Sequence, residues 1–331
     1  MSYDLSGKTV LVTGASGFIG KRVALELLKR GTDVRALVRN PAKAGELVAA
    51  GASIVTGDMT DPASFEAATC GCQAVLHLAG TTNEFKPRAH FERVNVEGTR
   101  FLAEAALRDG VERFLHVSTV WVYGLWSGPG ICETSACRES GQAYADTKLG
   151  AEREVRRLAA ERGLPAVILQ PSEVYGPGDP NWTDRPLELI RRGRMILAGG
   201  GKGLVQPVFI DDLVQGVLAA AERGRVGETY ILCGPDVVTI GEFFGYYARM
   251  MGKARLPSIP SRLALGLAGA AELAAKVSRR APVFTRQEVM STMATATYDG
   301  RKAERELGFK PKITVADGMR RVESWLRDPR G

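Results

Sequence analysis

The sequence predicts an α/β protein, in which a doubly wound parallel sheet is followed by a smaller, mostly helical C-terminal domain. Short apolar runs alternate with amphipathic stretches through the first half of the 331 residues, a pattern typical of βαβ units whose sheet is covered on both faces. After Pro171 the pattern changes, because Pro and Gly cluster at 176–180 and helical segments dominate from residue 239. We therefore expect two domains, formed by residues 1–170 with about 205–235, and by residues 171–204 with 236–331.

Each expected strand is a short run of apolar and β-branched residues. In chain order these runs are Thr9–Thr13, Val34–Val38, Ser53–Thr56, Ala74–Leu78, Arg113–Ser118 and Ala166–Leu169. Phe18–Arg30 and Phe91–Leu107 lie between strands and place apolar residues three and four positions apart, as amphipathic helices do. In the second domain, Leu263–Ala271 is an apolar helical stretch, which we expect either to cap an apolar pocket or to serve only in packing.

The composition is that of an ordinary folded protein, but its charge is unevenly distributed. Hydrophobic residues make up 45% and charged residues 24%, which excludes disordered and fibrous classes. Residues 253–331 hold 16 basic and 8 acidic residues, whereas the first 252 hold 28 and 29. This C-terminal surplus indicates an anionic substrate, a peripheral contact with an acidic membrane face, or only a solvated basic surface. No nucleic-acid-binding module is visible, so we expect no nucleic-acid partner.

Cysteine and histidine usage argues against disulfides and metals. The five cysteines are odd in number and form no CxxC pair: Cys70, Cys72, Cys132, Cys137 and Cys233. They are therefore predicted to be reduced thiols, and His77, His90 and His116 lack the spacing of metal ligands. No signal-peptide pattern precedes the first strand, and the apolar stretch Leu263–Ala275 is shorter than the ~20 residues of a spanning helix. We expect a soluble, cytoplasmic protein without a metal site.

A glycine-rich turn follows the first expected strand and opens a helix. It reads Thr13-Gly14-Ala15-Ser16-Gly17-Phe18-Ile19-Gly20, with GxxGxxG spacing. Glycines allow a tight turn and a close approach of the backbone to a pyrophosphate, which the free N–H groups of a helix N-terminus bind. We therefore predict that this turn binds a dinucleotide through Gly14, Ser16, Gly17, Phe18, Ile19 and Gly20.

The ends of the second and third expected strands indicate which dinucleotide binds. Proteins that select NAD place Asp or Glu about 20 residues past the glycines, but Val38-Arg39-Asn40 has no carboxylate, and Lys43 follows. Because a guanidinium suits a 2′-phosphate, we predict NADP(H) rather than NAD(H); the alternative is that Arg39 is only an exposed cation at the strand end. Asp58, beside Met59, follows the third strand, where its carboxylate would accept a hydrogen bond from the adenine amino group.

Tyr144 and Lys148 are four residues apart, so on a helix both project from one face. A free phenol has a pKa of ~10 and is a poor acid or base at neutral pH. A nearby ammonium favours the phenolate, so we expect Lys148 to lower the pKa of Tyr144. Upstream, Ser118 and Thr119 end the fifth expected strand.

Together with the glycine turn, these residues resemble the extended short-chain dehydrogenase/reductases, Rossmann-fold proteins that include NAD(P)-dependent epimerases and dehydratases. The resemblance covers nearly the whole chain. Further matches are His77-Leu78-Ala79-Gly80, Val94-Asn95-Val96-Glu97-Gly98-Thr99, Val174-Tyr175-Gly176-Pro177-Gly178, Phe209-Ile210-Asp211-Asp212-Leu213 and Glu306-Leu307-Gly308-Phe309-Lys310-Pro311.

The resemblance implies a catalytic trio and a set of cofactor contacts. Tyr144 would pass a proton to or from the substrate oxygen, Lys148 would hold the nicotinamide ribose, and Thr119 would hydrogen-bond the same oxygen, with Ser118 as the rival for that role. The residues that it places beside the cofactor are Leu78, Ala79, Gly80, Asn95, Ser118, Pro171 and Val174. For Asn95 the alternative is an amide satisfied by local backbone. Hydride would move between the nicotinamide and the substrate carbon.

The absence of phosphate-binding residues at two places, and one further similarity to known branches of the family, indicate the substrate class. Sugar-nucleotide members of the superfamily present an Asn and an Arg for substrate phosphates, but residues 170–173 and 205–208 show neither. Pro282-Val283-Phe284-Thr285-Arg286 is similar to the 3β-hydroxysteroid dehydrogenase and dihydroflavonol-reductase-like branches, which favour bulky, apolar alcohols and ketones. We expect Phe85, Trp121, Tyr123 and Ser172 to contact substrate, although aromatic loop residues also belong to local cores.

The sequence therefore predicts an NADP(H)-dependent oxidoreductase that acts on a carbonyl or secondary alcohol of a bulky, apolar small molecule. A sugar-nucleotide epimerase is the enzymatic alternative, since it would use the same Tyr144 and Lys148. A non-catalytic NADP-binding regulatory or assembly protein is the alternative from another class. A homodimer is expected, because the family pairs through helices.

Overall fold

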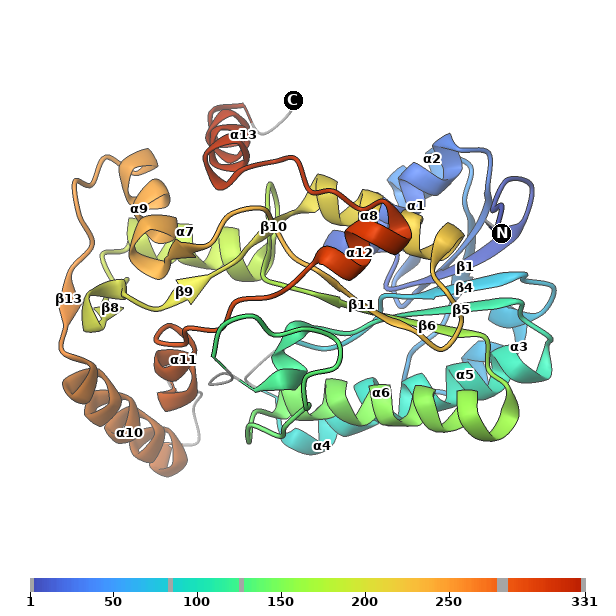
Figure 1. Ribbon diagram of the computed structural model, residues 1–331, viewed down its shortest axis with the longest axis horizontal. Coiled ribbons are helices and arrows are strands. Elements are labelled where there is room, and N and C mark those ends of the chain that lie inside the picture. The colour runs from blue at the N-terminus through green and yellow to red at the C-terminus, as the bar shows by residue number, and fades with distance from the viewer. Residues whose placement is uncertain (1–2, 83–85, 125–127, 279–284, 329–331) are drawn as a thin grey trace.

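The centre of the protein is a seven-stranded sheet in the computed structural model, which describes residues 3–82, 86–124, 128–278 and 285–328 (Figure 1). The strand order is β11-β6-β5-β4-β1-β2-β3, and every neighbouring pair is parallel. The strands are β1 (Thr9–Thr13), β2 (Asp33–Val38), β3 (Ser53–Thr56), β4 (Ala74–His77), β5 (Arg113–Val117), β6 (Ala166–Pro171) and β11 (Thr229–Leu232). The doubly wound parallel sheet and its first six strands are confirmed, with ends that differ by at most two residues. The sequence did not predict β11.

Helices cover both faces of the sheet (Figure 1). One face carries α1 (Phe18–Lys29), α2 (Gly45–Ala49), α8 (Ile210–Arg223) and α12 (Arg301–Leu307). The other carries α3 (Ser64–Thr69), α4 (Arg88–Phe91), α5 (Gly98–Arg108) and α6 (Ala143–Arg162). A π-helical turn at Glu92–Glu97 joins α4 to α5, so the helix expected at Phe91–Leu107 is continuous but locally widened. Such turns are frequent at functional sites.

A smaller lobe lies beyond the end of the sheet (Figure 1). Its helices are α7 (Arg185–Arg191), α9 (Ile240–Met250), α10 (Ser261–Ser278), α11 (Arg286–Ser291) and α13 (Val315–Arg327). Three short strand pairs link its segments: β7 (Val174–Tyr175) with β10 (Val208–Phe209), β8 (Leu197–Ala198) with β13 (Ser258–Ile259), and β9 (Leu204–Val205) with β12 (Val238–Thr239). The last segment of the chain returns to the sheet, because α12 packs against α8 and β11.

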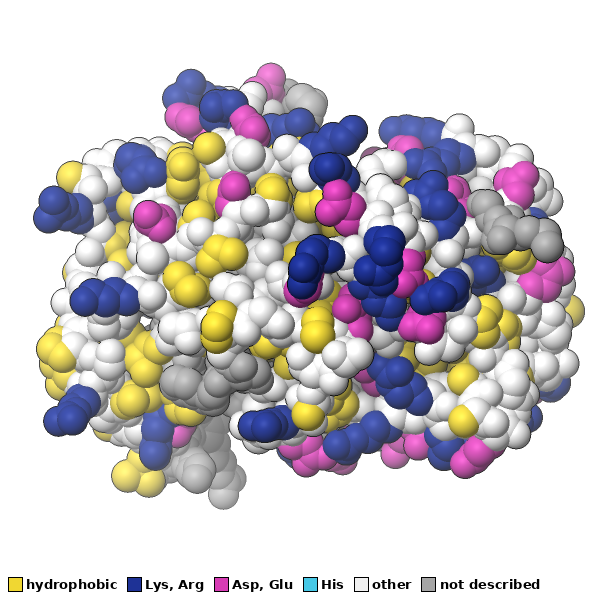
Figure 2. Space-filling view, in the orientation of Figure 1, with side chains coloured by type: hydrophobic (Ala, Val, Ile, Leu, Met, Phe, Trp, Pro, Cys, Tyr) yellow, Lys and Arg dark blue, Asp and Glu magenta, His cyan; other side chains and the backbone are white. Residues whose placement is uncertain are grey.

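Most of the basic side chains near the C-terminus have acidic partners. Lys302 binds Glu228 at 2.7 Å, and Arg321 binds Asp211 at 2.8 Å. Further pairs are Arg301–Asp299, Arg305–Glu306, Lys310–Glu304, Arg320–Asp317 and Arg327–Glu323. Figure 2 shows the result as Lys and Arg side chains interleaved with Asp and Glu over this part of the surface. Five of these seven pairs use acidic residues of the same segment, so only the pairs with Glu228 and Asp211 offset the basic surplus of residues 253–331.

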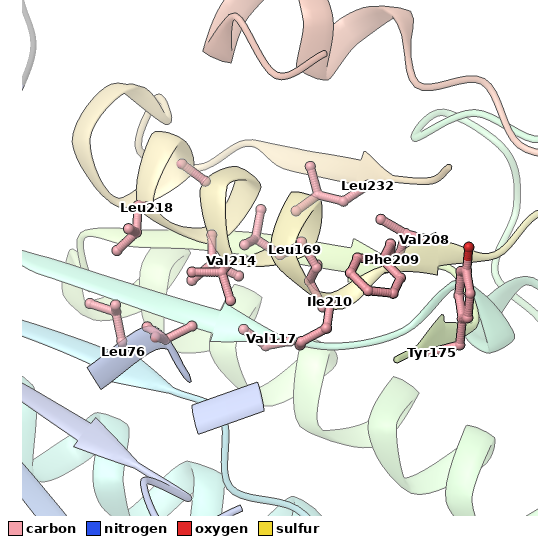
Figure 3. Close-up of a cluster of buried hydrophobic side chains, with 14 of the residues drawn as sticks. Leu76, Val117, Leu169, Tyr175, Val208, Phe209, Ile210, Val214, Leu218 and Leu232 are labelled. Atoms are coloured by element: carbon pink, nitrogen blue, oxygen red, sulfur yellow. The ribbon is translucent and has the colours of Figure 1, made fainter. Parts of the chain in front are cut away.

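Alternation along the strands divides the core between the two faces of the sheet. Val10 and Val12 of β1 pack in the cluster that contains residues of α1 and α8, whereas Leu11 packs in the cluster that contains residues of α5 and α6. Successive side chains of a strand point to opposite faces, so a buried parallel strand must be apolar throughout. Figure 3 shows the first cluster, where Val214 and Leu218 of α8 cover the sheet.

Asp212 fixes the chain segment that follows α12. Its Oδ2 accepts hydrogen bonds from the backbone N–H groups of Lys312 and Ile313, at 2.9 and 2.8 Å. The family-like motif around Asp212 therefore holds in place the segment that follows the family-like motif around Phe309. Within the described ranges, no helix has both the length and the apolar character needed to cross a membrane.

Candidate active site

A cavity of about 1070 Å³ lies at the carboxyl ends of the sheet strands and extends under the smaller lobe. In doubly wound sheets this edge is where ligands bind. The expected site residues that line it are Gly14, Ser16, Gly17, Phe18, Ile19, Gly20, Arg39, Lys43, Asp58, Met59, Leu78, Ala79, Gly80, Ser118, Thr119, Trp121, Tyr144, Lys148, Pro171, Ser172 and Val174. Asn95 and Tyr123 do not line it. Phe85 and residues 282–284 lie outside the described residues.

The glycine turn has the shape that a pyrophosphate requires. Gly14 has a φ of +67°, and a Cβ there would lie 2.9 Å from the Ala79 backbone, so no other residue fits without strain. A Cβ at Gly20 would overlap the Gly14 carbonyl oxygen. Gly17 caps α1 without a side-chain hydrogen bond, which leaves the N–H groups of the first turn available to an anion. The residues present therefore fit the dinucleotide.

Two cations and one carboxylate line the far end of the cavity. Arg39 and Lys43 are exposed, and neither forms an ion pair with another described residue. Asp58 accepts hydrogen bonds at Oδ1 from the backbone and hydroxyl of Thr60, at 2.8 and 2.7 Å. Burial acts to raise the pKa of Asp58, but these bonds and the charge of Arg39 outweigh it and hold the pKa below its usual value. The carboxylate is therefore ionised at neutral pH.

Asn95 lies behind the cavity wall and connects two of its parts. Its Oδ1 accepts from the backbone N–H of Thr81 at 2.9 Å, and its Nδ2 donates to the Thr81 carbonyl at 3.3 Å and to Thr147 Oγ1 at 3.1 Å. The buried amide is thus satisfied by groups of the protein itself. It fastens the loop after Gly80 to α6, the helix that carries Tyr144 and Lys148.

Tyr144, Lys148 and Thr119 meet at the junction of the two lobes. Tyr144 and Lys148 both lie on α6 and both line the cavity, as their spacing predicts. The Lys148 ammonium is buried and donates to the Val117 carbonyl at 2.7 Å. Thr119 hydrogen-bonds the Tyr144 phenol, whereas the buried hydroxyl of Ser118 has no hydrogen-bond partner among the described residues. This geometry favours Thr119 over Ser118 as the partner of the phenol.

The charge state of Tyr144 differs from the expectation. Burial raises the pKa of Tyr144 to about 12, and the hydrogen bond with Thr119 only partly opposes this rise. The ammonium of Lys148 donates to the Val117 carbonyl and not to the phenol. Burial also lowers the pKa of Lys148 to about 8, against the attraction of Glu152. At neutral pH the phenol is therefore protonated and equipped to donate a proton.

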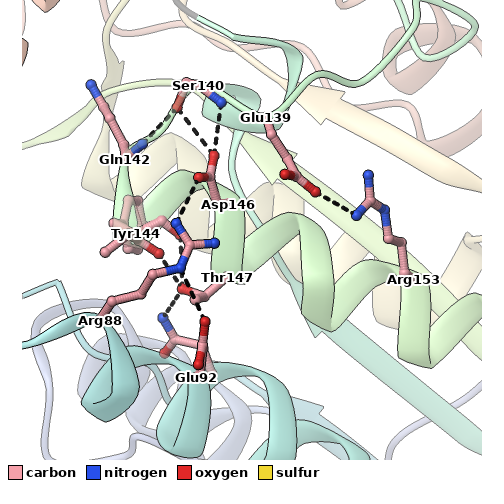
Figure 4. Close-up of polar contacts among 11 residues, drawn as sticks. Arg88, Glu92, Glu139, Ser140, Gln142, Tyr144, Asp146, Thr147 and Arg153 are labelled. Atoms are coloured by element: carbon pink, nitrogen blue, oxygen red, sulfur yellow. Dashed lines mark hydrogen bonds and ion pairs between the residues drawn. The ribbon is translucent and has the colours of Figure 1, made fainter.

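A network of polar contacts anchors the first turn of α6 (Figure 4). Asp146 is buried, and its Oδ1 accepts from the Ser140 backbone N–H at 2.8 Å. Arg88 of α4 donates to Asp146 Oδ2 at 3.1 Å and to Glu92 at 3.0 Å. Because Arg88 and Asp146 are 58 residues apart in the chain, no local pattern reveals the contact between them. It fixes the turn on which Tyr144 stands.

The residues expected to contact substrate fall into different places. Trp121 lines the cavity, and its ring meets that of Tyr144 edge-on with centroids 6.1 Å apart. Ser172 also lines the cavity, but its hydroxyl donates to the Gln206 carbonyl at 2.6 Å. Tyr123 was expected at the rim and is instead buried, where its hydroxyl donates to Gln170 Oε1 at 2.6 Å. It belongs to the local core because the turn at Val120–Tyr123 buries Val120, Val122 and Tyr123 in one cluster and leaves Trp121 partly exposed.

Glu173 is a lining residue that sequence reasoning did not identify. Its Oε1 accepts from Trp121 Nε1 at 3.1 Å, while its buried Oε2 has no hydrogen-bond partner among the described residues. Burial raises the pKa of this carboxyl above its usual value. A carboxyl directly after a buried strand, in a segment where family members carry an amide, was the available signal.

Fold and site together define a dinucleotide-dependent oxidoreductase of the Rossmann type.

Comparison with known proteins agrees with this assignment. The NAD dependent epimerase/dehydratase family matches residues 10–233. The chain is 30% identical over 316 residues to 4-hydroxy-2-methyl-3-oxo-4-farnesyl-3,4-dihydroquinoline-1-oxide ketoreductase of Stigmatella aurantiaca, covering 93% of each chain. It is 27% identical over 332 residues to 3-beta-hydroxysteroid dehydrogenase of Mycolicibacterium neoaurum, covering 94% of this chain and 89% of that one.

A solved structure shows the same fold. The dTDP-glucose 4,6-dehydratase DesIV of Streptomyces venezuelae, a double mutant with NAD and DAU bound, is 26% identical with a TM-score of 0.81, covering 97% of this chain and 98% of that one. The chain belongs to the NAD dependent epimerase/dehydratase family. It is an enzyme of the extended short-chain dehydrogenase/reductase type, as its motifs predict, and its relatives include the hydroxysteroid dehydrogenase branch.

Proposed function

We propose that the enzyme is an NADP(H)-dependent reductase that converts a carbonyl group of a bulky, apolar substrate to a secondary alcohol. The observation that carries this proposal is the meeting of Tyr144, Lys148 and Thr119 in the same cavity as the glycine turn. A neutral phenol is the form needed to protonate the oxygen of a carbonyl that is being reduced.

Each catalytic side chain has a separate task. When bound, the nicotinamide cofactor would supply hydride to the carbonyl carbon. The Tyr144 O–H donates its proton to the carbonyl oxygen, so that oxygen ends as a hydroxyl and the phenolate is reprotonated from solvent. Thr119 donates a second hydrogen bond to the same oxygen. Lys148, held by the Val117 carbonyl at 2.7 Å, is placed to hold the nicotinamide ribose.

The preference for NADP(H) rests on Arg39 and Lys43. Both line the cavity at the end of β2, and no described carboxylate forms an ion pair with either. Asp58, the neighbouring carboxylate, follows the end of β3 and accepts hydrogen bonds from Thr60. Two unpaired cations suit the charge of a 2′-phosphate, which accepts paired hydrogen bonds from a guanidinium.

An apolar substrate is supported by the walls that the smaller lobe contributes. They include Met195, Ile196, Phe244, Ile259, Leu267 and Val289. The positions at which sugar-nucleotide enzymes present phosphate-binding groups do not serve a phosphate here. The Gln206 amide is buried and donates to Gly234 and Cys233, and a carboxyl at Glu173 lines the cavity. The farnesylated and steroid substrates in the relatives' names agree with this class.

The experiment that tests the proposal combines cofactors with substrate classes. Purified protein is given NADPH or NADH with apolar ketones, aldehydes or UDP-sugars, and nicotinamide absorbance and products are followed. The proposal expects NADPH consumption with bulky ketones and little use of NADH. Epimerised UDP-sugar without net cofactor consumption would show an epimerase instead, and no turnover with any substrate despite cofactor binding would favour a non-catalytic protein.

A further inference from the structure

Helix α10 exposes a continuous apolar face. We define the α10 stripe as Leu263, Leu267, Ala270, Leu273 and Ala274, which are all exposed. Their spacing of three and four residues places them on one side of the helix. The side chains of Leu263, Leu267 and Leu273 are 51%, 47% and 65% exposed. Three of the seven large hydrophobic side chains that stand exposed among the described residues therefore belong to this one helix.

The α10 stripe is continuous with the mouth of the active-site cavity. Leu267 belongs to the stripe and also lines the cavity. Ile196, which precedes β8, is 52% exposed and lines the cavity as well. Ala264, on the buried side of α10, lines the same space. An apolar path therefore leads from the outer face of α10 into the cavity.

Three arginines with no acidic partner among the described residues lie in the segments that lead into β8, β13 and α10. Arg194, which also lines the cavity, Arg255 and Arg262 are exposed, and none forms an ion pair with a described residue. Leu197 pairs with Ser258 in the parallel β8–β13 pair, and Arg194 and Arg255 each lie three residues before it. Arg262 stands in the first turn of α10. Figure 2 shows hydrophobic side chains next to Lys and Arg at this end of the molecule.

The one described carboxylate on α10 does not offset these charges. Glu272 forms an ion pair with Arg286 at 3.3 Å and accepts a hydrogen bond from its backbone N–H. The region differs in this respect from α12 and α13, where basic side chains have acidic partners. Arg255 and Arg262, two members of the C-terminal basic surplus, therefore lie just before and within α10 with no acidic partner among the described residues.

We propose that the α10 stripe and Arg194, Arg255 and Arg262 dock on the surface of an anionic lipid bilayer. An amphipathic helix binds a bilayer by burying its apolar face at the headgroup level, and basic residues beside it bind anionic lipid. A second copy of the chain fits less well, because Glu272, the one described carboxylate on α10, is already paired with Arg286, so this face offers the arginines of another copy no free acidic partner on that helix. In the proposed function, which this inference extends, an apolar ketone would pass from the bilayer into the cavity past Leu267 and Ile196.

The test is co-sedimentation of the full chain with vesicles, without substrate. The protein should sediment with vesicles of phosphatidylglycerol and phosphatidylcholine, less with phosphatidylcholine alone, and less again at high salt. The double variant Leu263→Asp/Leu273→Asp should lose binding. Each of Arg255→Ser and Arg262→Ser should weaken binding roughly fivefold, from the contribution of a basic residue near the surface. Val226→Asp, at another side chain that is 54% exposed, is the matched control and should bind as wild type.

Two further measurements distinguish failure of the docking proposal from failure of the proposed function. Leu263 and Leu273 do not line the cavity, so the double variant should keep its circular dichroism, its NADPH binding and its turnover of a small, water-soluble ketone. Vesicle binding without turnover would refute the proposed function alone. The docking proposal is overturned if wild type ignores phosphatidylglycerol vesicles at low salt, or if the double variant still binds them. It is also overturned if sedimentation velocity shows that the double variant only converts a dimer to a monomer.

Discussion

Replacing Arg39 with Ser should separate the affinities for NADPH and NADH. Arg39 and Lys43 line the adenosine end of the cavity, and Arg39 has no ion-pair partner among the described residues. Its guanidinium is thus free to bind a 2′-phosphate. Hydrogen bonds to charged groups contribute about 1.5–3 kcal/mol. Loss of this contact should therefore raise the Kd for NADPH roughly 10- to 150-fold, while the Kd for NADH, which lacks the phosphate, changes little.

The assay is titration of nicotinamide fluorescence with each cofactor. Arg162→Ser is a matched control, because Arg162 is an exposed arginine in the last turn of α6 and does not line the cavity. It should bind both cofactors as wild type does. The reasoning is refuted if Arg39→Ser weakens NADPH and NADH equally, or if it leaves NADPH binding unchanged.

Three other perturbations test the site and the core. Glu173→Gln should keep KM for ketone near the wild-type value, since its side-chain oxygen can still accept the hydrogen bond from Trp121 Nε1, whereas Glu173→Ala removes that acceptor and should raise KM up to about tenfold; a Gln variant as impaired as Ala would contradict this role of the hydrogen bond. Burial lowers the pKa of Lys148 from 10.5 to about 8, so the unfolded chain holds this proton more tightly and stability rises with pH between these values. The free energy of unfolding of wild type in urea, relative to that of Lys148→Met, should then rise by about 3 kcal/mol from pH 8 to 10.5. A difference in the free energy of unfolding that stays constant with pH would contradict the lowered pKa. Leu115→Ala, at a fully buried position of β5, should cost about 2–5 kcal/mol in urea unfolding, and a cost below about 1 kcal/mol would contradict the packing described for that strand.

Much of the sheet could be predicted because its strands are buried on both faces. Burial requires uninterrupted apolar runs, and the six predicted runs stand out against polar helices. β11 was not predicted, because it lies in the part of the chain where Pro and Gly obscure the alternation of strands and helices. That Tyr144 and Lys148 share one face follows from their spacing once the segment is helical, since four residues make about one helical turn.

Other parts of the site depend on contacts that no local pattern records. Burial raises the pKa of Tyr144, whereas the sequence argument from Lys148 gave the opposite direction. Arg88 and Asp146 are 58 residues apart in the chain, and only the folded structure brings them together. Tyr123 and Trp121 are neighbours in sequence, yet the turn directs one into the core and the other into the cavity.

The most direct test of the account is the reduction rate of Tyr144→Phe with NADPH and a ketone that wild type accepts. The variant keeps the ring but lacks the proton that the phenol donates. A positioned acid contributes roughly 10²–10⁴-fold, so kcat should fall by that factor while the Kd for NADPH stays near the wild-type value. Reduction by Tyr144→Phe at the wild-type rate would contradict the assignment of Tyr144 as the proton donor.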